Sequence, residues 1–545
     1  MDSSALVTCK DDYVYIQCDP YIRSKLDFVP GKIWLPNKQT LKAIKTPYTI
    51  KRIMQSLAKE LPVEYFQYDE EFFDIYKKLV TNESYKRNNM FYNCGDIPNS
   101  KSPTWKHQRI GYHMLEQMPS LLFNWGMGSG KTRPIVQYVH NHQEYKNVLI
   151  LCPLVVVQVW KEQFEKHAEV TKGMLFLDTD TIKERAKRIQ CSQKEGKTVV
   201  VLNYDTIING NMYSILTSTK WDMIILDESH RIKSAGSKRS LILYSMSKGV
   251  TKKVCLSGTP CSNSILDVYG QYRFLDCGIF GTNSDKFENE YANYNRFNEH
   301  VIDSYKNLDK FYELFNTIAY SVDVDDVIEL PESQDLFYKI DMPSDVKQVY
   351  TSIKNKQYAF VGGKEVIVQN PLTKILRLRQ LASGYVPCEG GTIEHFSNNR
   401  QKLLSEVIGD INVNEPIVIY TNFVEDMKSV REVCTSLHRS CSELSGAKHE
   451  YAPWKEQKTN VLIAQIQSGS EGIDCTRARY CIYYSMVDNI KDYFQSKRRL
   501  KRQGQKRNMK FIHLFMNGSL DSKMYISLIN NKNFIDEVLS GNIEL

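Results

Sequence analysis

The sequence lacks the features that would place the chain in a membrane, outside a cell or around zinc. Its 13 cysteines include no CxxC pair, so the ligand spacing of a zinc ribbon is absent. No apolar run approaches the roughly 18 residues that a membrane-spanning helix needs, and the start, MDSSALVTCKDDYVYIQC, has neither the basic residues nor the apolar core of a signal peptide. We therefore expect reduced thiols, no membrane, and the cytoplasm, or the host-cell cytoplasm if the chain is viral.

The composition is that of an ordinary globular protein with one basic stretch. Hydrophobic residues make up 42% and charged residues 25% of the 545 residues, and the net charge is +8. Seven cations fall within residues 497–507, KRRLKRQGQKR. This density suits phosphate groups, although a solvated helix face is the plainer interpretation of the run taken alone.

The order of apolar runs predicts an α/β fold with two doubly wound parallel-sheet lobes. LLFNW, NVLILCPL, MLFLD, TVVVLNY, MIILDE and KVCLSGTP alternate with amphipathic stretches, and alternation returns with PIVIYTNF, NVLIAQI, RYCIYYSM and KFIHLFM. Between them polar helices are expected, one over residues 297–318. The predicted domains are a small α+β N-terminal domain at 1–95, a first lobe at 96–275, a helical insert at 276–400, a second lobe at 401–530 and a tail at 531–545.

A glycine-rich segment follows the apolar run LLFNW and precedes a predicted helix. It consists of Gly126, Met127, Gly128, Ser129, Gly130, Lys131 and Thr132. Glycines let backbone amides turn toward phosphates, the lysine neutralises β/γ-phosphate charge, and the threonine hydroxyl can ligate Mg²⁺. The strict pattern GxxxxGK[ST] would need a glycine where Trp125 stands. The context of strand, loop and helix nevertheless predicts a phosphate-binding loop.

A second acidic and basic segment ends a later apolar strand. Residues 221–233 read WDMIILDESHRIK. Asp227 is predicted to hold Mg²⁺, directly or through water, and Glu228 to orient or deprotonate the attacking water, because phosphoryl transfer chiefly needs positioning and charge neutralisation. We expect His230 to couple the site to neighbouring segments, with a satisfied turn histidine as the alternative.

Two arginines of the basic stretch lie three residues apart. Arg499 and Arg502 would therefore share one face of a helix. Arginine suits a planar transition state with several oxygens, and a finger supplied from a second lobe would make hydrolysis depend on lobe closure. Some charges of this stretch are thus predicted to serve catalysis and others to solvate the helix.

An ordered series of motifs carries a family resemblance over about residues 104 to 530. The series is TWKHQRIG, GMGSGKT, VLILCPLVVVQVWKEQF, VVVLNYDTI, LDESHRIKSAGSKRS, LSGTPCSN, ILRLRQLASGY, IVIYTNF, QSGSEGID and QSKRRLKRQGQ. Together these motifs closely resemble superfamily 2 helicases, specifically the Snf-type double-stranded DNA translocases. The Snf assignment rests on RIK at 231–233, SK at 237–238, LRLRQ at 376–380 and GQ at 504–505.

The resemblance implies two RecA-like lobes, ATP and Mg²⁺ as cofactors, and a role for each matching residue. Gln108 resembles the glutamine that reads adenine, and Ser257, Gly258 and Thr259 resemble the segment that couples hydrolysis to DNA movement. Gly469, Gly472 and Asp474 match the second-lobe loop that faces nucleotide and DNA. The candidate DNA contacts are Lys233, Lys238, Arg377, Ser468 and Gly469. The implied partner is double-stranded or branched DNA, and a monomer is expected.

The chain departs from the family pattern at several positions. Trp125 and Gly126 replace an acidic pair, and Ser229 stands where alanine or glycine is commoner. The segment at 318–332 carries no positive charge where relatives do; in its place stand Ser321, Asp323, Asp325 and Asp326. A regulatory or DNA contact made by that segment elsewhere is therefore in doubt.

The N-terminal stretch FVPGKIWLPNKQTLKAIKTP is faintly similar to the HepA-related domain of fork-remodelling relatives. Pro30, Gly31 and Trp34 fit that pattern, whereas Leu41 or a neighbour replaces a second tryptophan. The resemblance implies recognition of DNA structure. The alternative is a small hairpin and helix that merely pack on the motor.

The sequence thus predicts an ATP-dependent motor that tracks along duplex DNA. Two alternatives stay open. One is a helicase that separates strands or remodels forks by branch migration. The other is a DNA-binding scaffold without ATPase activity, which the retained Lys131, Asp227, Glu228, Arg499 and Arg502 disfavour.

Overall fold

The computed structural model describes residues 5–26, 29–60, 62, 65–87, 91, 94–126, 128–168, 173–178, 181–196, 198–261, 264–295, 302–323, 330–356, 358–361, 364–368, 370–388, 391–469, 473–502, 504–530, 534 and 538. The chain forms two compact units, one of residues 1–126 and 130–327 and the other of residues 328–545 with 127–129. The division lies inside the predicted insert 276–400. No helix among the described residues is long and apolar enough to cross a membrane.

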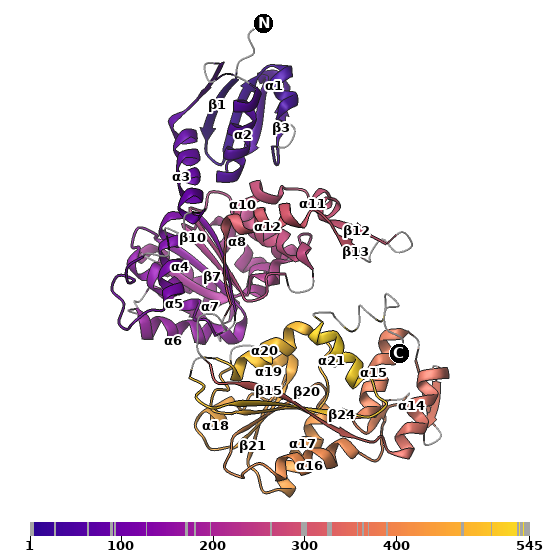
Figure 1. Cartoon of the computed structure of the whole chain (residues 1–545). Coiled ribbons are helices and arrows are strands. Elements are labelled where there is room, and N and C mark those ends of the chain that lie inside the picture. The colour runs from indigo at the N-terminus through magenta and orange to yellow at the C-terminus, as the bar shows by residue number, and fades with distance from the viewer. Residues whose placement is uncertain are drawn as a thin grey trace. The chain divides into compact units, whose positions relative to one another are not determined.

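The first unit begins with a domain in which helices cover one face of a five-stranded sheet (Figure 1). The sheet order is β3-β4-β2-β1-β5, and alternate residues such as Val14 and Ile16 face the helices. The strands are β1 Ala5–Lys10, β2 Tyr13–Cys18, β3 Ile33–Leu35, β4 Thr40–Ile44 and β5 Phe66–Tyr68. The helices are α1 Pro20–Lys25, the 3-10 turn η1 Pro36–Lys38, α2 Pro47–Glu60 and α3 Glu70–Arg87.

A seven-stranded parallel sheet forms the core of the first lobe. Its order is β14-β6-β11-β10-β7-β9-β8. The strands are β6 Ser120–Trp125, β7 Asn147–Cys152, β8 Met174–Leu177, β9 Thr198–Asn203, β10 Met223–Asp227, β11 Lys252–Ser257 and β14 Ala319–Val322. All five residues of β10 are buried, as a strand covered on both faces requires. Because the strands are parallel, the segments that follow β6, β10 and β11 meet at one edge of the sheet.

Helices pack on this sheet throughout the first lobe (Figure 1). They are α4 Lys106–Gln117, α5 Thr132–Asn141, α6 Val157–His167, α7 Ile182–Glu195, α8 Gly210–Ser218, α9 Lys238–Met246, α10 Tyr269–Phe280, α11 Ser284–Tyr291 and α12 Leu308–Ile318. The 3-10 turns are η4 Leu154–Val156, η5 Tyr204–Ile208, η6 Ser229–Ile232 and η7 Ile265–Val268. This arrangement is that of a RecA-like lobe, as the sequence predicts.

The prediction of one helix over residues 297–318 is wrong. Among the described residues of that range only α12 is helical, and β13, Ile302–Tyr305, pairs antiparallel with β12, Ala292–Tyr294. Residues 296–301 lie outside the described part. Asn307 separates strand and helix because its backbone is left-handed, with φ of 53°. Asparagine tolerates that conformation but no α-helix continues through it.

The second unit holds a six-stranded parallel sheet with the order β15-β24-β23-β20-β22-β21. The strands are β15 Ser333–Ile340, β20 Ile417–Thr421, β21 Cys441–Leu444, β22 Val461–Gln465, β23 Tyr480–Tyr483 and β24 Met509–Met516. The helices are α14 Ser344–Lys356, α15 Pro371–Ala382, α16 Asn399–Gly409, α17 Val424–Ser436, α18 Tyr451–Lys455, α19 Ile466–Gly469, α20 Ile490–Leu500 and α21 Asp521–Ile529. Two hairpins complete the unit, β16 Tyr358–Val361 with β17 Lys364–Ile367, and β18 Tyr385–Pro387 with β19 Ile393–His395. It is the second RecA-like lobe.

Candidate active site

The glycine-rich segment connects β6 to α5 in the first lobe. Gly128 and Gly130 have φ of 86° and 72°, values that favour glycine because it has no Cβ. Lys131 stands at the amino end of α5 and Thr132 is its first helical residue. Met127 lies outside the described residues. A glycine loop followed by a helix N-terminus presents backbone amides and a positive dipole, which is the chemistry that binds phosphate.

Gln108 fixes this loop to helix α4. Its side-chain oxygen accepts a hydrogen bond of 3.1 Å from the Trp105 amide, and its nitrogen donates one of 3.2 Å to the Gly130 carbonyl. A Cβ at Gly130 would lie 2.5 Å from that nitrogen and would displace the Gln108 side chain, and the φ of 72° also favours glycine. The predicted role of Gln108 in reading adenine stays a prediction, but its side chain lies against the loop that would hold the nucleotide.

Asp227 and Glu228 lie at the carboxyl end of β10, beside Lys131. The Lys131 ammonium is 3.8 Å from the Glu228 carboxylate, and the two side chains are 12% and 10% exposed. Burial raises the pKa of Asp227 to about 6, although Lys131 opposes the shift. Glu228 has a left-handed backbone with φ of 51°. Folding thus gathers a lysine and two carboxylates where phosphate and Mg²⁺ would meet.

The indole of Trp160, on α6, was not among the sequence-predicted site residues. Its N–H donates a hydrogen bond of 3.0 Å to the Asp227 carboxylate. The Tyr204 hydroxyl donates one of 2.8 Å to the Asp227 carbonyl. Both aromatic side chains are buried. They hold the end of β10 in place, and no local sequence signal identifies them, because each is 23 or more positions from Asp227.

His230 connects the carboxylates to the end of β11. Its Nδ1 lies 3.2 Å from a Glu228 carboxylate oxygen and 3.4 Å from the Ser257 hydroxyl. The Ser257 hydroxyl also accepts a hydrogen bond of 3.2 Å from the Thr259 amide, which brings Gly258 into the same turn. The His230 imidazole thus lies between the Glu228 carboxylate and the Ser257 hydroxyl. The predicted coupling would need such a link, because a change at Glu228 would reach Ser257 through one imidazole.

The departure at Ser229 has a structural reason. Ser229 is fully buried, and its hydroxyl donates a hydrogen bond of 2.7 Å to the side-chain oxygen of Gln271 on α10. The Gln271 nitrogen donates to the carbonyls of Pro260 and Asp267, at 2.8 and 3.1 Å. Serine therefore ties the carboxylate turn to the segment after β11. Alanine or glycine could not form this link.

The departure at Trp125 also has a structural reason. Trp125 is fully buried, stacks on Phe123 at 4.5 Å between ring centroids, and meets the rings of His107 and Tyr320 edge-on. A Cβ at Gly111 on α4 would lie 2.7 Å from its ring. The indole thus packs α4 against β6 and β14. An acidic side chain in this apolar position would be costly.

Strand β14 brings part of the segment 318–332 beside the start of the loop. The Gly126 amide donates a hydrogen bond of 3.1 Å to the Val322 carbonyl, and the Asn124 side chain donates one of 2.9 Å to Ser321. Asp323 follows the strand, whereas Asp325 and Asp326 lie outside the described residues. Residues 319–322 of the segment therefore form a strand of the first sheet.

The two arginines that the sequence predicts as fingers, Arg499 and Arg502, lie near one backbone carbonyl of the second unit. The prediction that both share one face of a helix is wrong, because α20 ends at Leu500 and Arg502 lies beyond it. Arg499 and Arg502 nevertheless each place a guanidinium nitrogen 3.5 Å from the Ile473 carbonyl. The neighbouring Asp474 carboxylate accepts hydrogen bonds from the amide and hydroxyl of Thr476, at 2.8 and 2.7 Å. Gly472 lies outside the described residues, and Ser468 and Gly469 are described only as backbone of α19.

A buried polar cluster fixes the helix that carries Arg499. The Asp335 carboxylate lies 2.8 Å from the Lys497 ammonium and 2.9 Å from His513 Nε2. The His513 ring is stacked between Tyr483 and Phe337, at 4.9 and 5.2 Å. Ionic and hydrogen-bonded contacts with His513 and Lys497 lower the pKa of Asp335 despite its burial. The cluster joins β15, β24 and α20.

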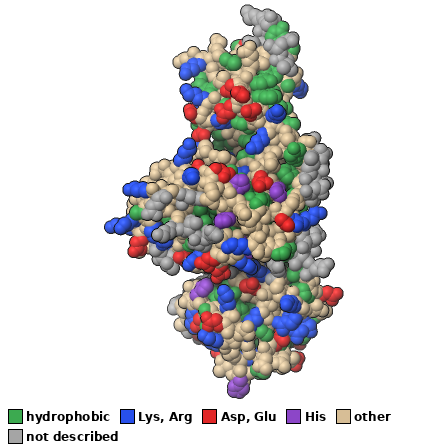
Figure 2. Space-filling view, turned by 90° about the vertical axis from the view of Figure 1, so that its left-hand side faces the viewer, with side chains coloured by type: hydrophobic (Ala, Val, Ile, Leu, Met, Phe, Trp, Pro, Cys, Tyr) green, Lys and Arg blue, Asp and Glu red, His purple; other side chains and the backbone are tan. Residues whose placement is uncertain are grey.

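The candidate DNA contacts are spread over both units. Lys233 lies 3.3 Å from Asp267, Lys238 is exposed in the first turn of α9, and Arg377 on α15 donates a hydrogen bond of 2.8 Å to Gln380. Figure 2 shows basic side chains interspersed with acidic ones on the face that it presents.

Two family models match the chain. The SNF2-related domain matches residues 112–384, and the helicase conserved C-terminal domain matches residues 399–504. The chain belongs to the SNF2-related family. Within this family it is 23% identical to the "CHD3-type chromatin-remodeling factor PICKLE" of Arabidopsis thaliana over 490 residues, which cover 79% of this chain and 34% of PICKLE.

Two further SNF2-related proteins illustrate the range of lengths. "Putative protein p41" of Acyrthosiphon pisum secondary endosymbiont phage 1 is 22% identical, with 76% of this chain and 93% of p41 covered. "DNA annealing helicase and endonuclease ZRANB3" of Mus musculus is 22% identical, with 77% of this chain and 39% of ZRANB3 covered. The chain spans about a third of PICKLE, so the activities of whole SNF2-related proteins do not transfer to it directly.

Proposed function

We propose that this SNF2-related chain is a DNA-dependent ATPase that translocates on double-stranded DNA, remodelling DNA structures or displacing bound proteins. The observation that carries the proposal is the meeting of Lys131, Asp227 and Glu228 at one sheet edge, with Lys131 3.8 Å from Glu228. The left-handed glycines of the loop fit a phosphate chain, and the Thr132 hydroxyl with the Asp227 carboxylate is an oxygen donor set that suits Mg²⁺. Mg²⁺ would neutralise the developing phosphate charge.

In this mechanism Lys131 and the loop amides orient the phosphates, and Glu228 orients the attacking water and receives its proton. His230 then transmits the change at Glu228 to Ser257, which lies 3.4 Å away. Arg499 and Arg502 would supply positive charge to the transition state when the second lobe closes. The burial of Arg499 at the end of α20 and the carbonyl partner that it shares with Arg502 support a fixed orientation.

ATPase assays on single substitutions test the proposed site. Lys131→Ala and Glu228→Gln should each lower kcat by roughly a hundredfold or more, since each removes a group that acts on the transition state. Glu165→Gln, an exposed position on α6, is the matched control and should keep the wild-type rate. Near wild-type turnover in either site variant would exclude the mechanism.

The arginines are tested separately. Arg499→Ala should lower kcat by about a thousandfold while leaving KM for ATP little changed, because an arginine finger acts on the transition state. Arg498→Ala, on a different face of α20, is its control. Equal losses in both variants would mean that the helix contributes only general charge.

The DNA substrate is tested by comparing two displacement assays on the full chain. Triplex displacement without unwinding supports translocation on duplex DNA, with a strong decrease at higher salt because phosphate contacts dominate. Efficient separation of duplex strands would support the alternative, a strand-separating helicase. Selective ATPase stimulation by forked or four-way DNA would support fork remodelling and recognition by residues 1–95.

The description of ZRANB3 as an annealing helicase gives the fork-remodelling alternative some weight. The Arg23 guanidinium lies 4.2 Å over the Trp34 ring. Arg23 is therefore a position to mutate in the N-terminal domain when ATPase stimulation by forked or four-way DNA is measured. The length match to p41 is compatible with a phage or other viral setting, where the compartment would be the host cytoplasm. A monomer is proposed.

A further inference from the structure

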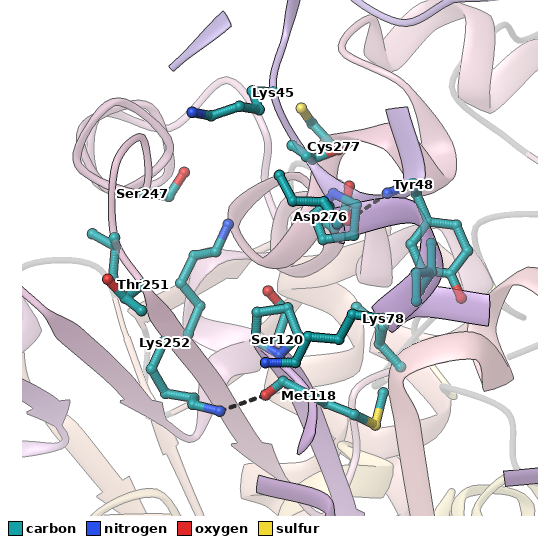
Figure 3. Close-up of a pocket in the computed structure, with 18 of the residues that line it drawn as sticks. Lys45, Tyr48, Lys78, Met118, Ser120, Ser247, Thr251, Lys252, Asp276 and Cys277 are labelled. Carbon is teal, nitrogen blue, oxygen red and sulfur yellow. Dashed lines mark hydrogen bonds between the residues drawn. The ribbon is translucent and has the colours of Figure 1, made fainter. Parts of the chain in front are cut away.

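A cavity of about 480 Å³ lies between the N-terminal domain and the first lobe, both in the first unit. Its walls come from the junction of β4 and α2, from α3, from the end of α4, and from the segment between α9 and β11. Figure 3 shows Lys78, from α3, and Lys252, from β11, among the residues that line it. The volume lies within the range typical of small-molecule sites, about 300–1,000 Å³.

The cavity is at the opposite edge of the sheet from the ATP site. Lys252 is the first residue of β11, whereas Ser257, its last, lies near His230. Lys252 also donates hydrogen bonds to the carbonyls of Leu115 and Met118 at the end of α4, the latter at 2.6 Å (Figure 3). One lysine therefore joins the cavity to α4, which contacts the glycine loop through Gln108, and to β11, which ends near His230.

Most carboxylates in the cavity wall already have partners. Glu71 lies 2.7 Å from Lys45, Glu83 lies 2.6 Å from Lys51, and Glu116 lies 2.7 Å from His113. Asp276 accepts hydrogen bonds from the amides of Tyr48 and Gly278, at 3.2 and 2.8 Å. Asp12 is the remaining carboxylate of the wall, and its charge acts on Lys253.

The wall carries one basic side chain more than it carries carboxylates, the basic ones being Lys45, Lys78, Lys248, Lys252, Lys253 and Arg273. Within the described part of the chain, the ammonium groups of Lys78 and Lys253 have no hydrogen bond or ion pair, and Lys248 only faces the Tyr244 ring at 5.6 Å. An ammonium has three N–H donors, and Lys252 uses two on carbonyls. Burial lowers the pKa of Lys252 to about 7, and repulsion from Lys78 adds to the shift. An anion between these lysines would remove the repulsion.

The rest of the wall is largely apolar. It includes Ile44, Pro47, Ile75, Leu79, Met118 and the ring of Tyr48. Such walls favour a ligand with a ring or aliphatic body as well as a charged group. A bare inorganic anion would leave these side chains without contacts.

We propose that this cavity binds a small phosphorylated molecule whose phosphate bridges Lys78 of the N-terminal domain and Lys252 of the first lobe. The ligand body packs against the apolar wall. Binding fastens the N-terminal domain to the lobe and, through α4 and β11, biases Gln108 and Ser257. The site is separate from the ATP site and is an effector site of the motor.

Isothermal titration calorimetry with AMP and with inorganic pyrophosphate tests the site on the full chain. All measurements use the Lys131→Ala background, so that binding at the ATP loop is suppressed. We expect saturable binding of AMP, a loss of at least tenfold in affinity in Lys78→Met, and no change in Lys77→Met, the exposed neighbour on α3 that does not line the cavity.

The two probes distinguish what the site reads. Binding of pyrophosphate as tight as that of AMP, lost in Lys78→Met, assigns recognition to the phosphate; weaker binding assigns part of it to the apolar wall. No saturable binding of either probe, or equal affinities in Lys78→Met and Lys77→Met, overturns the proposal. Because ATP turnover is not measured, these outcomes are independent of the proposed motor function.

Discussion

The indole N–H of Trp160 donates a hydrogen bond of 3.0 Å to the Asp227 carboxylate. Hydrogen bonds to charged groups contribute about 1.5–3 kcal/mol, so this contact orients the proposed Mg²⁺ ligand. Trp160→Phe keeps a ring in the core and removes the donor. We expect kcat for ATP to fall by roughly tenfold and the Mg²⁺ concentration for half-maximal rate to rise.

Trp221→Phe is the control for this prediction. Trp221 is equally buried in the same lobe, but its indole N–H donates to the Leu216 carbonyl, at 2.8 Å. Its substitution should reduce stability without changing the Mg²⁺ requirement. An unchanged Mg²⁺ titration in Trp160→Phe would show that the indole only packs.

Ser229→Ala should destabilise the first lobe. The substitution leaves the buried oxygen of Gln271 without the donor that lies 2.7 Å away, and an unsatisfied buried acceptor costs about 1–3 kcal/mol. Urea denaturation measures the loss. Burial raises the pKa of the neighbouring Cys255 thiol and Ser229 opposes that shift, so Cys255 should become no more reactive in the variant. Wild-type stability in Ser229→Ala would contradict the structural role of this serine.

Gly270→Ala should be poorly tolerated. A Cβ at this position would lie 2.0 Å from the Ile232 carbonyl oxygen, so α10 would have to move away from the turn after Glu228. Overpacking of this kind costs about 1–3 kcal/mol or more. Gly236→Ala, with no atom within 4 Å of the added Cβ, is the control. Comparison of the two thermal midpoints decides the prediction.

Lys252 should make stability depend on pH. Burial lowers its pKa from 10.5 to about 7, Lys78 adds to the shift, and Glu116 and Glu144 oppose it. Between about pH 7 and pH 10 the unfolded chain then binds more protons than the folded chain, so folding stability rises with pH. Relative to Lys252→Met, the wild type should gain up to about 1.4 kcal/mol per pH unit.

Urea denaturation of both proteins across this pH range measures the gain. Lys220→Met, an exposed lysine that precedes β10, should give a difference that is independent of pH. A flat difference for Lys252→Met as well would mean that Lys252 stays protonated in the fold.

Local patterns in the sequence were sufficient to predict the strands, the glycine loop and the carboxylates at the end of β10. Each depends on residues that are close in sequence and on the rule that parallel strands end at one edge. Trp160, Gln271 and β14 could not be predicted in this way. Trp160 is 67 positions from Asp227, and Gln271 is 42 positions from Ser229. β14 pairs with β6, which is farther away in the sequence. Only tertiary packing brings these parts together.

The two departures from the family pattern show the same limit. The sequence alone gives no reason for serine at 229 or tryptophan at 125. Their partners, Gln271 and Gly111, lie on other helices. The error over residues 297–318 has a local cause instead. The polar periodicity of the segment favours one helix, whereas the left-handed backbone of Asn307 separates β13 from α12.

The left-handed backbone at Glu228 has a consequence for engineering this protein. A non-glycine residue with φ of 51° costs on the order of 1 kcal/mol that glycine would not. A screen that rewards heat resistance alone would therefore favour glycine at this position and select against the side chain proposed to activate water. Variants for structural work should keep Glu228, because the most stable form of the chain would lack the side chain proposed to activate water.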